Sequence, residues 1–270
     1  MKKKILLLPI YLVTFMLLFS SCEKNAVQDI TTPYSGAQFK YYNFAINGPT
    51  VNFYANNIKT TATLTTGAVE AAAGVNFGGL VPLRGYSLAP TGNVKFSSLT
   101  PSTMVVNNAL GQGPNIETST VTKDVVDGRN YSYYTSGIYN YTTKTSDAFI
   151  IEDVLPAPDT SIAYIRLVNP GHNTTALSLE LTQTITSTVP GVPPIVTVTT
   201  PITGVVYKTA SQYIAVKQGS YALRLLDSPS GRSVSRAATS FLKGRLYTFT
   251  LRGNLITGTP APFLDFTENR

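Results

Sequence analysis

The chain is poor in the residues on which most enzymes depend. Its 270 residues include one Cys, one His and no Trp. A zinc site of the Cys/His type needs several such ligands, and a nucleophilic cysteine needs a base beside it. The 14 acidic residues contain no evident pair of the kind that hydrolyses glycosides. We therefore expect a protein that is not an enzyme, with no catalytic residue, no metal and no cofactor.

The chain also lacks the clusters of positive charge that mark nucleic-acid-binding proteins. Its 21 basic and 14 acidic residues give a net charge of +7, and no run of Lys or Arg follows the N-terminus. Removal of three N-terminal lysines with a signal peptide would leave 18 basic residues against 14 acidic ones, a net charge of +4. Nucleic-acid partners are therefore not expected.

The chain has one continuous apolar run near the N-terminus, and this run is too short for a membrane span. Lysines at 2–4 precede apolar residues 5–19, whereas a transmembrane helix needs about 20 apolar residues. This pattern predicts a signal peptide. The small residues before Cys22 resemble the lipobox of bacterial lipoproteins, in which the cysteine is acylated; the alternative is an ordinary secreted protein with an incidental cysteine. We predict that Cys22 carries lipid, because a free thiol is otherwise unexpected in a secreted chain. Several acyl chains would then hold the protein firmly on the membrane.

The remainder of the chain has the pattern of an all-β protein. Runs such as 177–181, 195–199 and 246–251 alternate apolar with polar residues and are rich in β-branched and aromatic side chains. Gly, Pro and Asn separate these runs, and no stretch keeps a helical period for three turns. The sequence therefore predicts strands throughout.

The second half of the chain repeats the first. Three blocks match in order: 39–43 with 165–169 at an offset of 126, Tyr86 and Gly92 with Tyr213 and Gly219 at 127, and 128–133 with 244–249 at 116. The shorter last offset places about ten additional residues in the first half, most simply within 102–122.

A duplicated all-β unit of this size predicts two tandem immunoglobulin-like β-sandwich domains after a lipoprotein signal peptide. The expected boundaries are a signal peptide at 1–21, a lipidated tether at 22–36, a first sandwich at 37–155, a linker at 156–160 and a second sandwich at 161–270. Each sandwich is expected to fold alone, with some seven strands.

Three segments of the second half resemble a known bacterial family. They are Tyr164–Pro170, Tyr213–Leu225 and Phe241–Gly253, and they resemble the family catalogued as domain of unknown function 4397. Its members often occur in tandem on secreted proteins and lipoproteins of Bacteroidota. The resemblance implies a β-sandwich of the cell surface or periplasm, and it implies no catalytic residue. Together with the predicted lipid on Cys22, we expect the chain to be anchored in the outer membrane. The first half departs from the pattern at residues 45–49.

Tyrosine is in excess, with 16 residues, and it clusters between 131 and 141. Tyr134, Tyr139 and Tyr141 match residues of the second half that are not aromatic, so the shared fold does not require them. If Gly137 lies in a tight turn, the last two return along a neighbouring strand. An exposed strip of these three rings would suit a sugar ring or an extended peptide. The alternative is cross-strand pairing that stabilises a hairpin.

Other residues that might carry chemistry have simpler explanations. His172 has no neighbouring carboxylate or cysteine in the sequence, so we expect an exposed loop histidine. Asp153 and Asp159 flank the linker and could contribute to an interdomain calcium site, although no calcium-loop pattern supports it. Arg129 and Arg245, each after a glycine, could be a repeated ligand contact, but we favour arginine stems that cover apolar surface.

These observations predict a non-enzymatic cell-envelope lipoprotein whose two β-sandwich modules serve adhesion, scaffolding or ligand presentation. Its partners would be the membrane, through the N-terminal lipid, and an envelope protein or a glycan. The alternative is a glycan-binding accessory lipoprotein of a nutrient-uptake system.

Overall fold

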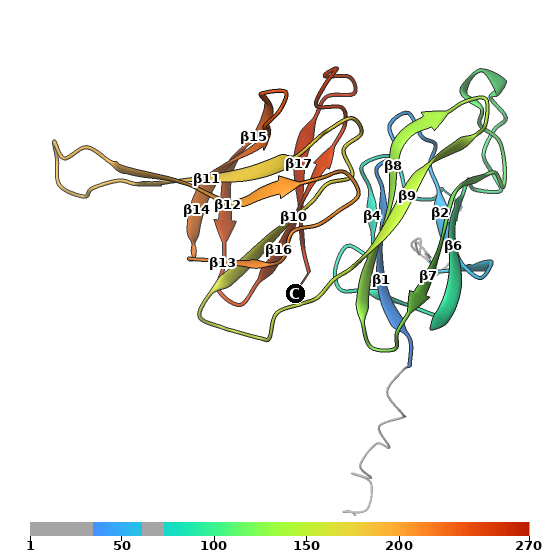
Figure 1. Ribbon diagram of the computed structural model, residues 1–270, viewed down its shortest axis with the longest axis horizontal. Coiled ribbons are helices and arrows are strands. Elements are labelled where there is room, and N and C mark those ends of the chain that lie inside the picture. Colours follow the sequence, from blue (N-terminus) through green and yellow to red (C-terminus); the bar gives the residue numbers. More distant parts are fainter. Residues whose placement is uncertain (1–34, 61–72, 270) are drawn as a thin grey trace, which may run out of the picture. The chain divides into compact units, whose positions relative to one another are not determined.

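The computed structural model describes residues 35–60 and 73–269 (Figure 1). The expected signal peptide, Cys22 and nearly all of the tether lie outside the described residues. Within the described ranges the chain forms 17 strands and one short 3-10 helix, η1 (Asn108–Leu110). Four sheets pair into two sandwich-like bodies, which confirms the all-β tandem architecture. No helix in these ranges is long and apolar enough to cross a membrane.

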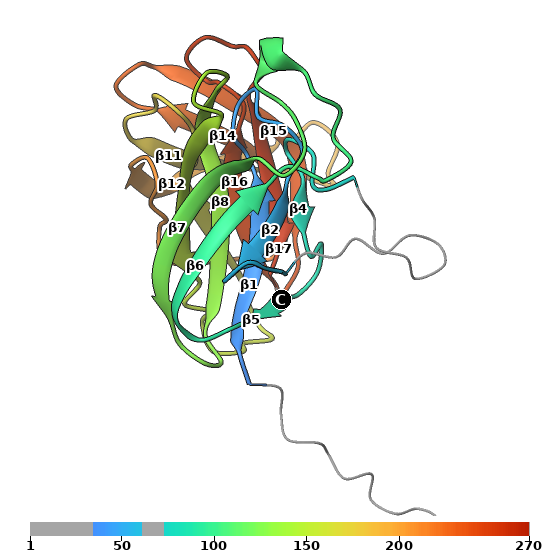
Figure 2. The same cartoon turned by 90° about the vertical axis from the view of Figure 1, so that its right-hand side faces the viewer.

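The first sandwich is built from two layers. One layer contains β1 (Ala37–Asn43), β4 (Leu80–Val81), β5 (Ser87–Ala89), β8 (Asn130–Asn140) and β9 (Thr145–Glu152), and the other contains β2 (Asn52–Ala55), β3 (Ile58–Lys59), β6 (Gly92–Leu99) and β7 (Glu117–Val125). Figure 2 shows the β6–β7 layer in front of the layer that contains β1 and β8. Strand β1 pairs in parallel with β8 and antiparallel with β4 and β5. The core between the layers is aromatic, and includes Phe39, Tyr41, Phe53, Phe96 and Tyr133.

The second sandwich repeats this plan. One layer has the order β13 (Ile214–Val216), β10 (Ala163–Val168), β16 (Leu246–Arg252) and β17 (Phe263–Glu268), and the other has the order β12 (Ile195–Val205), β11 (Leu177–Ile185), β14 (Gly219–Asp227) and β15 (Arg232–Phe241). Strand β10 is parallel to β16, as β1 is to β8. Along β14, alternate residues such as Tyr221, Leu223 and Leu225 are buried, as a half-covered antiparallel strand requires. The core is more aliphatic than that of the first sandwich.

The predicted repeat appears as matched hydrogen bonds. The hydroxyl of Tyr131 accepts the amide of Val126 at 3.1 Å, and the hydroxyl of Tyr247 accepts the amide of Leu242 at 3.1 Å. Both pairs lie at the predicted offset of 116. Each hydroxyl binds a backbone amide five residues upstream, just before the strand begins, and so fixes the entry of that strand. Tyr131 and Tyr247 also belong to the two cores.

Some strands are buried on both faces. In β1 and β8 of the first sandwich and in β16 of the second, nearly every residue is buried. Alternate residues face the core of their own sandwich, while Tyr42 of β1 and Tyr134 of β8 belong to a smaller apolar cluster on the other face. That cluster contains Tyr42, Phe44, Tyr134 and Phe149 together with Val168 at the end of β10. The two sandwiches, which belong to one compact unit, therefore share buried surface.

Two segments of the described residues distinguish the two sandwiches. Between β6 and β7 the first has a loop at 100–116, whereas 228–231 connect β14 to β15. The additional residues thus lie in 100–116, and Glu117 to Thr122 of the predicted insertion belong to β7. In the second sandwich, β11 and β12 extend into a long hairpin (Figure 1).

Candidate functional site

A buried ion pair connects the end of the first sandwich to β10. The carboxylate of Asp153, directly after β9, accepts a hydrogen bond from Nη2 of Arg166 at 2.6 Å, and both side chains are buried. It also accepts the hydroxyls of Ser132 at 2.7 Å and Tyr86 at 3.0 Å. Nε of Arg166 donates to Thr248 Oγ1 at 2.8 Å. Donors therefore surround this carboxylate.

The suggested interdomain calcium site is wrong for this reason. The guanidinium of Arg166 occupies the position beside the Asp153 carboxylate that a cation would need. The carboxylate of Asp159 instead accepts hydrogen bonds from the amide and the hydroxyl of Ser161 in its own loop. Within the described residues, no group of three or more His, Cys, Asp or Glu side chains could hold a metal ion.

The position equivalent to Arg166 in the first sandwich is Lys40, which is also buried. Its Nζ donates to the carbonyl of Glu268 at 3.3 Å and lies over the ring of Tyr86, as Arg166 lies over Tyr213. Burial lowers the pKa of Lys40 to about 8, although the Asp153 carboxylate opposes the change. Burial alone would lower the pKa of Arg166, but Asp153 and nearby tyrosines raise it above its ordinary value. The charged groups of Lys40, Asp153 and Arg166 thus have partners within the fold, and we assign them a structural role.

The repeated arginines also belong to the framework. Arg129 forms an ion pair with Glu152 at 2.8 Å, and Arg245 forms one with Glu268 at 2.5 Å. Both acids stand at the ends of the last strands of their sandwiches, and both pairs keep the offset of 116. Each pair joins the start of one strand to the end of its neighbour, so the repetition has a structural reason and indicates no shared ligand.

The predicted strip of exposed tyrosines is wrong. Tyr134 and Tyr139 are buried, and only Tyr141 is exposed, at 38%. Tyr134 stacks between Tyr42 at 4.3 Å and Phe149 at 5.1 Å, measured between ring centroids. Its ring points away from the core of the first sandwich, but the smaller apolar cluster described above covers that face of the sheet. The strip therefore reduces to one ring.

The expected turn at Gly137 is also absent. Strand β8 continues to Asn140, and Gly137, with φ of 73°, lies where the register with β9 shifts. A glycine is favoured there because the left-handed backbone region disfavours a side chain. The chain reverses only after Asn140, whose side chain accepts the amides of Thr142 and Thr143. Tyr139 consequently stays on β8.

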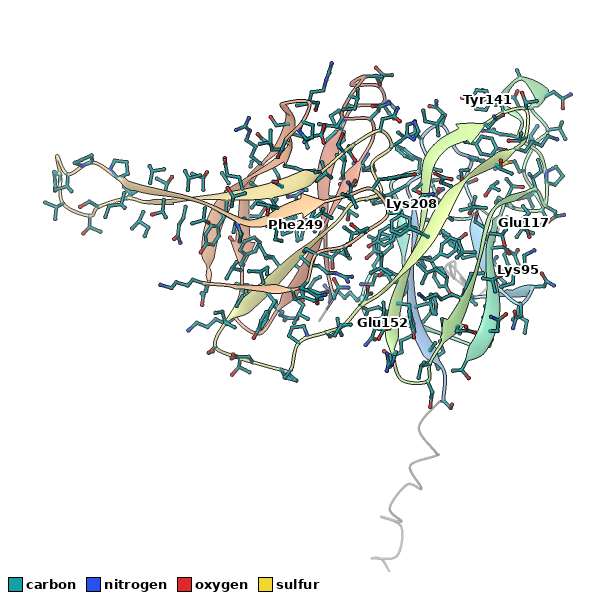
Figure 3. The ribbon with its side chains drawn as sticks, viewed as in Figure 1. Lys95, Glu117, Tyr141, Glu152, Lys208 and Phe249 are labelled. Carbon is teal, nitrogen blue, oxygen red and sulfur yellow. The ribbon has the colours of Figure 1, made fainter. Side chains whose placement is uncertain are left out.

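The loop at 100–116 and Tyr141 form the first candidate contact surface, which we call the loop surface. The hydroxyl of Tyr139 donates to the carbonyl of Gly111 at 2.8 Å and holds the loop against the end of β8. A Cβ on Gly111, whose φ is 60°, would overlap the carbonyl of Tyr141. The loop exposes Val105 at 82%, together with Val106 and Leu110. Figure 3 shows Tyr141 beside this loop. Exposed Ser102, Asn107 and Asn108 lie among these apolar residues, and residues 100–116 carry no charged side chain.

The hairpin formed by residues 181–199 is the second candidate surface, which we call the β11–β12 hairpin. Thr182 pairs with Val198 and Ile185 with Ile195, so the two strands remain paired to the tip. The first six residues of β12 are all exposed, with Ile195 at 65% and Val198 at 55%. Side chains project from both faces of this ribbon in Figure 3.

The sequence reasoning missed this hairpin, although a signal for it exists. No charged residue occurs anywhere in 181–207, a range that combines β-branched residues with four prolines. At its base, a groove of about 480 Å³ lies between the hairpin and β13, lined by Leu181, Gln183, Thr199 and Tyr221 among others. His172, which we expected to be exposed in a loop, is half-buried, and its ring meets that of Tyr207 edge-on, with 6.4 Å between the ring centroids.

Comparisons with known proteins give only distant similarities. No family model matches the chain, so its likeness to the domain-of-unknown-function family remains a resemblance. No curated protein matches it either. Among solved structures, a proposed cell adhesion protein from Bacteroides ovatus is 8% identical, with a TM-score of 0.26, and the match covers 88% of this chain and 99% of that one. A leucine-rich repeat protein from Bacteroides thetaiotaomicron is 13% identical, with a TM-score of 0.19, over 83% of this chain and 27% of that one.

Proposed function

We propose that this chain is a non-enzymatic lipoprotein of the outer cell envelope, attached through lipid on Cys22, whose two β-sandwich modules present contact surfaces for adhesion or scaffolding. No bound metal or cofactor forms part of this proposal. Its partners are envelope or surface proteins.

One observation carries the proposal: two described segments in which the sandwiches differ are uncharged and expose apolar side chains. These are the loop surface and the β11–β12 hairpin. The framework that the sandwiches share instead holds its buried charges in mutual contacts, as Asp153 and Arg166 do. Exposed apolar segments beyond the needs of a fold are typical of protein contacts.

The lipid anchor is tested by replacing Cys22. In cells that process lipoproteins, the native chain should enter the detergent phase of a two-phase partition, and Cys22→Ala should move to the aqueous phase. Asn25→Ala is a matched control that should behave as the native chain. A Cys22→Ala chain that stays in the detergent phase would contradict lipidation.

The contact role is tested on cells that lack the native chain. Attachment to a host-cell or abiotic surface should be restored by the native chain and not by Val105→Ser/Val106→Ser. Val154→Ser is the control, because Val154 is similarly exposed but lies outside both surfaces. Equal attachment with both variants would refute a role for the loop surface. Glycan-array binding that is lost in Tyr141→Ala would instead favour the glycan-binding alternative.

A further inference from the structure

The β11–β12 hairpin is an addition to the repeated fold. In the first sandwich, Ala55 pairs with Ile58, and Asn56 and Asn57, both with positive φ, form the turn between them. In the second, Leu181 takes the place of Ala55 and pairs with Thr199, so residues 182–198 stand where two asparagines suffice. The fold can be closed without the hairpin, and its presence needs another reason.

Strand β12 is a sheet edge without charged residues. It ends the order β12-β11-β14-β15, and it has 11 residues. The other long strands that end a sheet, β7, β9, β15 and β17, all contain charged residues. Such charges prevent edge-to-edge pairing in natural proteins. Strand β12 contains none.

Pairing is confined to the outer part of this edge. Pro201 has no amide hydrogen to donate, and the register with β11 shifts near the base of the hairpin. The six residues Ile195–Thr200 precede that proline, are exposed and are all β-branched, with Val and Thr alternating over 196–199. Their outward backbone groups provide an open ladder of donors and acceptors.

The charge distribution favours a second copy as the occupant. The net charge is +7, or +4 without the predicted signal peptide, so two copies carry net charge of the same sign. The range 181–207 is free of charge, and two hairpins can meet there without like charges in contact. A membrane is less suited, because a membrane-inserting tip normally has aromatic or basic residues at the headgroups, and residues 181–206 contain neither.

We infer that two copies of this chain associate by antiparallel pairing of residues Ile195–Thr200 of β12 around a two-fold axis. The pairing joins the sheet β12-β11-β14-β15 of one copy to the same sheet of its partner. It deepens the proposed scaffolding role and rests on it, since attachment of many copies to one membrane raises their local concentration.

The test uses the full chain with Cys22→Ala, so that no acyl chain can cause association. Sedimentation equilibrium should show a concentration-dependent dimer. Val196→Lys/Val198→Lys should weaken the dimer about tenfold or more, because like charges then face each other across the paired strands. Val126→Lys/Val154→Lys, the same change at two exposed valines outside both surfaces, is the control and should leave the dimer intact.

A charge complement separates loss of pairing from loss of folding. Val196→Glu/Val198→Glu should also be monomeric, and its mixture with the lysine variant should form a heterodimer. A monomer at all concentrations would overturn the inference, as would a dimer that persists in the lysine variant or a mixture that does not associate. If the parent is a monomer that binds phospholipid vesicles, and the lysine variant does not bind them, the inference would be overturned in favour of a membrane contact. None of these results bears on lipidation of Cys22, so failure here differs from failure of the proposed function.

Discussion

Replacement of Asp153 by alanine should destabilise the protein strongly. The change leaves the guanidinium of Arg166 buried without its carboxylate, which lies 2.6 Å away in the native chain. Removal of one member of a buried ion pair costs about 3–5 kcal/mol, because the other charge stays desolvated. The hydroxyls of Ser132 and Tyr86 each lose an acceptor as well, and that of Tyr86 keeps only the hydrogen bond that it accepts from Asn269 at 2.9 Å. We expect a loss of about 3–5 kcal/mol in the free energy of unfolding.

A double variant separates the charge effect from simple loss of contacts. Asp153→Ala/Arg166→Met leaves neither charge buried and should recover much of the loss. Asp147→Ala is the control, because the ion pair of Asp147 with Lys208 is largely exposed and should contribute no more than about 1 kcal/mol. Urea unfolding is followed by circular dichroism and tyrosine fluorescence, since the chain has no Trp. A cost below about 1 kcal/mol for Asp153→Ala, or a double variant as unstable as the single one, would refute a desolvated pair.

Two further predictions concern the same framework. Lys40→Met should make stability less dependent on pH between about 8 and 10. Since burial lowers the pKa of Lys40 to about 8, the unfolded chain binds more protons in that range, and native stability rises with pH there; an unchanged urea-unfolding profile in the variant would contradict this account. Tyr131→Phe and Tyr247→Phe should each cost about 1 kcal/mol, because each leaves a backbone amide without its hydroxyl acceptor. Thermal melting of the two variants should show similar shifts, and no shift in either would show that water replaces the hydroxyl.

The shared framework could be predicted from the sequence because core packing constrains it. Phe39 and Ile165, or Tyr133 and Phe249, recur at fixed offsets since each faces the core of its sandwich. Alternation along a strand reveals this face directly. The same reasoning failed for Tyr134, because alternation shows only that its ring points away from the core. It cannot show that a second apolar cluster covers the outer face.

The hairpin was hidden by two changes of length that nearly cancel. Residues 182–198 lengthen the second half, while the first half has a longer connection between Lys59 and Val75 than the second has between Thr200 and Val205. The offsets on either side are therefore 126 and 127, and the alignment crosses the region without a visible gap. The partners of Asp153 were also unpredictable, because Tyr86, Ser132 and Arg166 come from distant strands.

Replacement of residues 182–198 with Asn-Asn, the turn of the first sandwich, in the Cys22→Ala chain tests whether the shared framework makes the fold and the added segments make the contacts. Sedimentation equilibrium and thermal melting are measured on the same sample. We predict a monomer with cooperative, β-type melting close to that of the parent. A chain that no longer folds, or one that still dimerises as the parent does, would contradict the account.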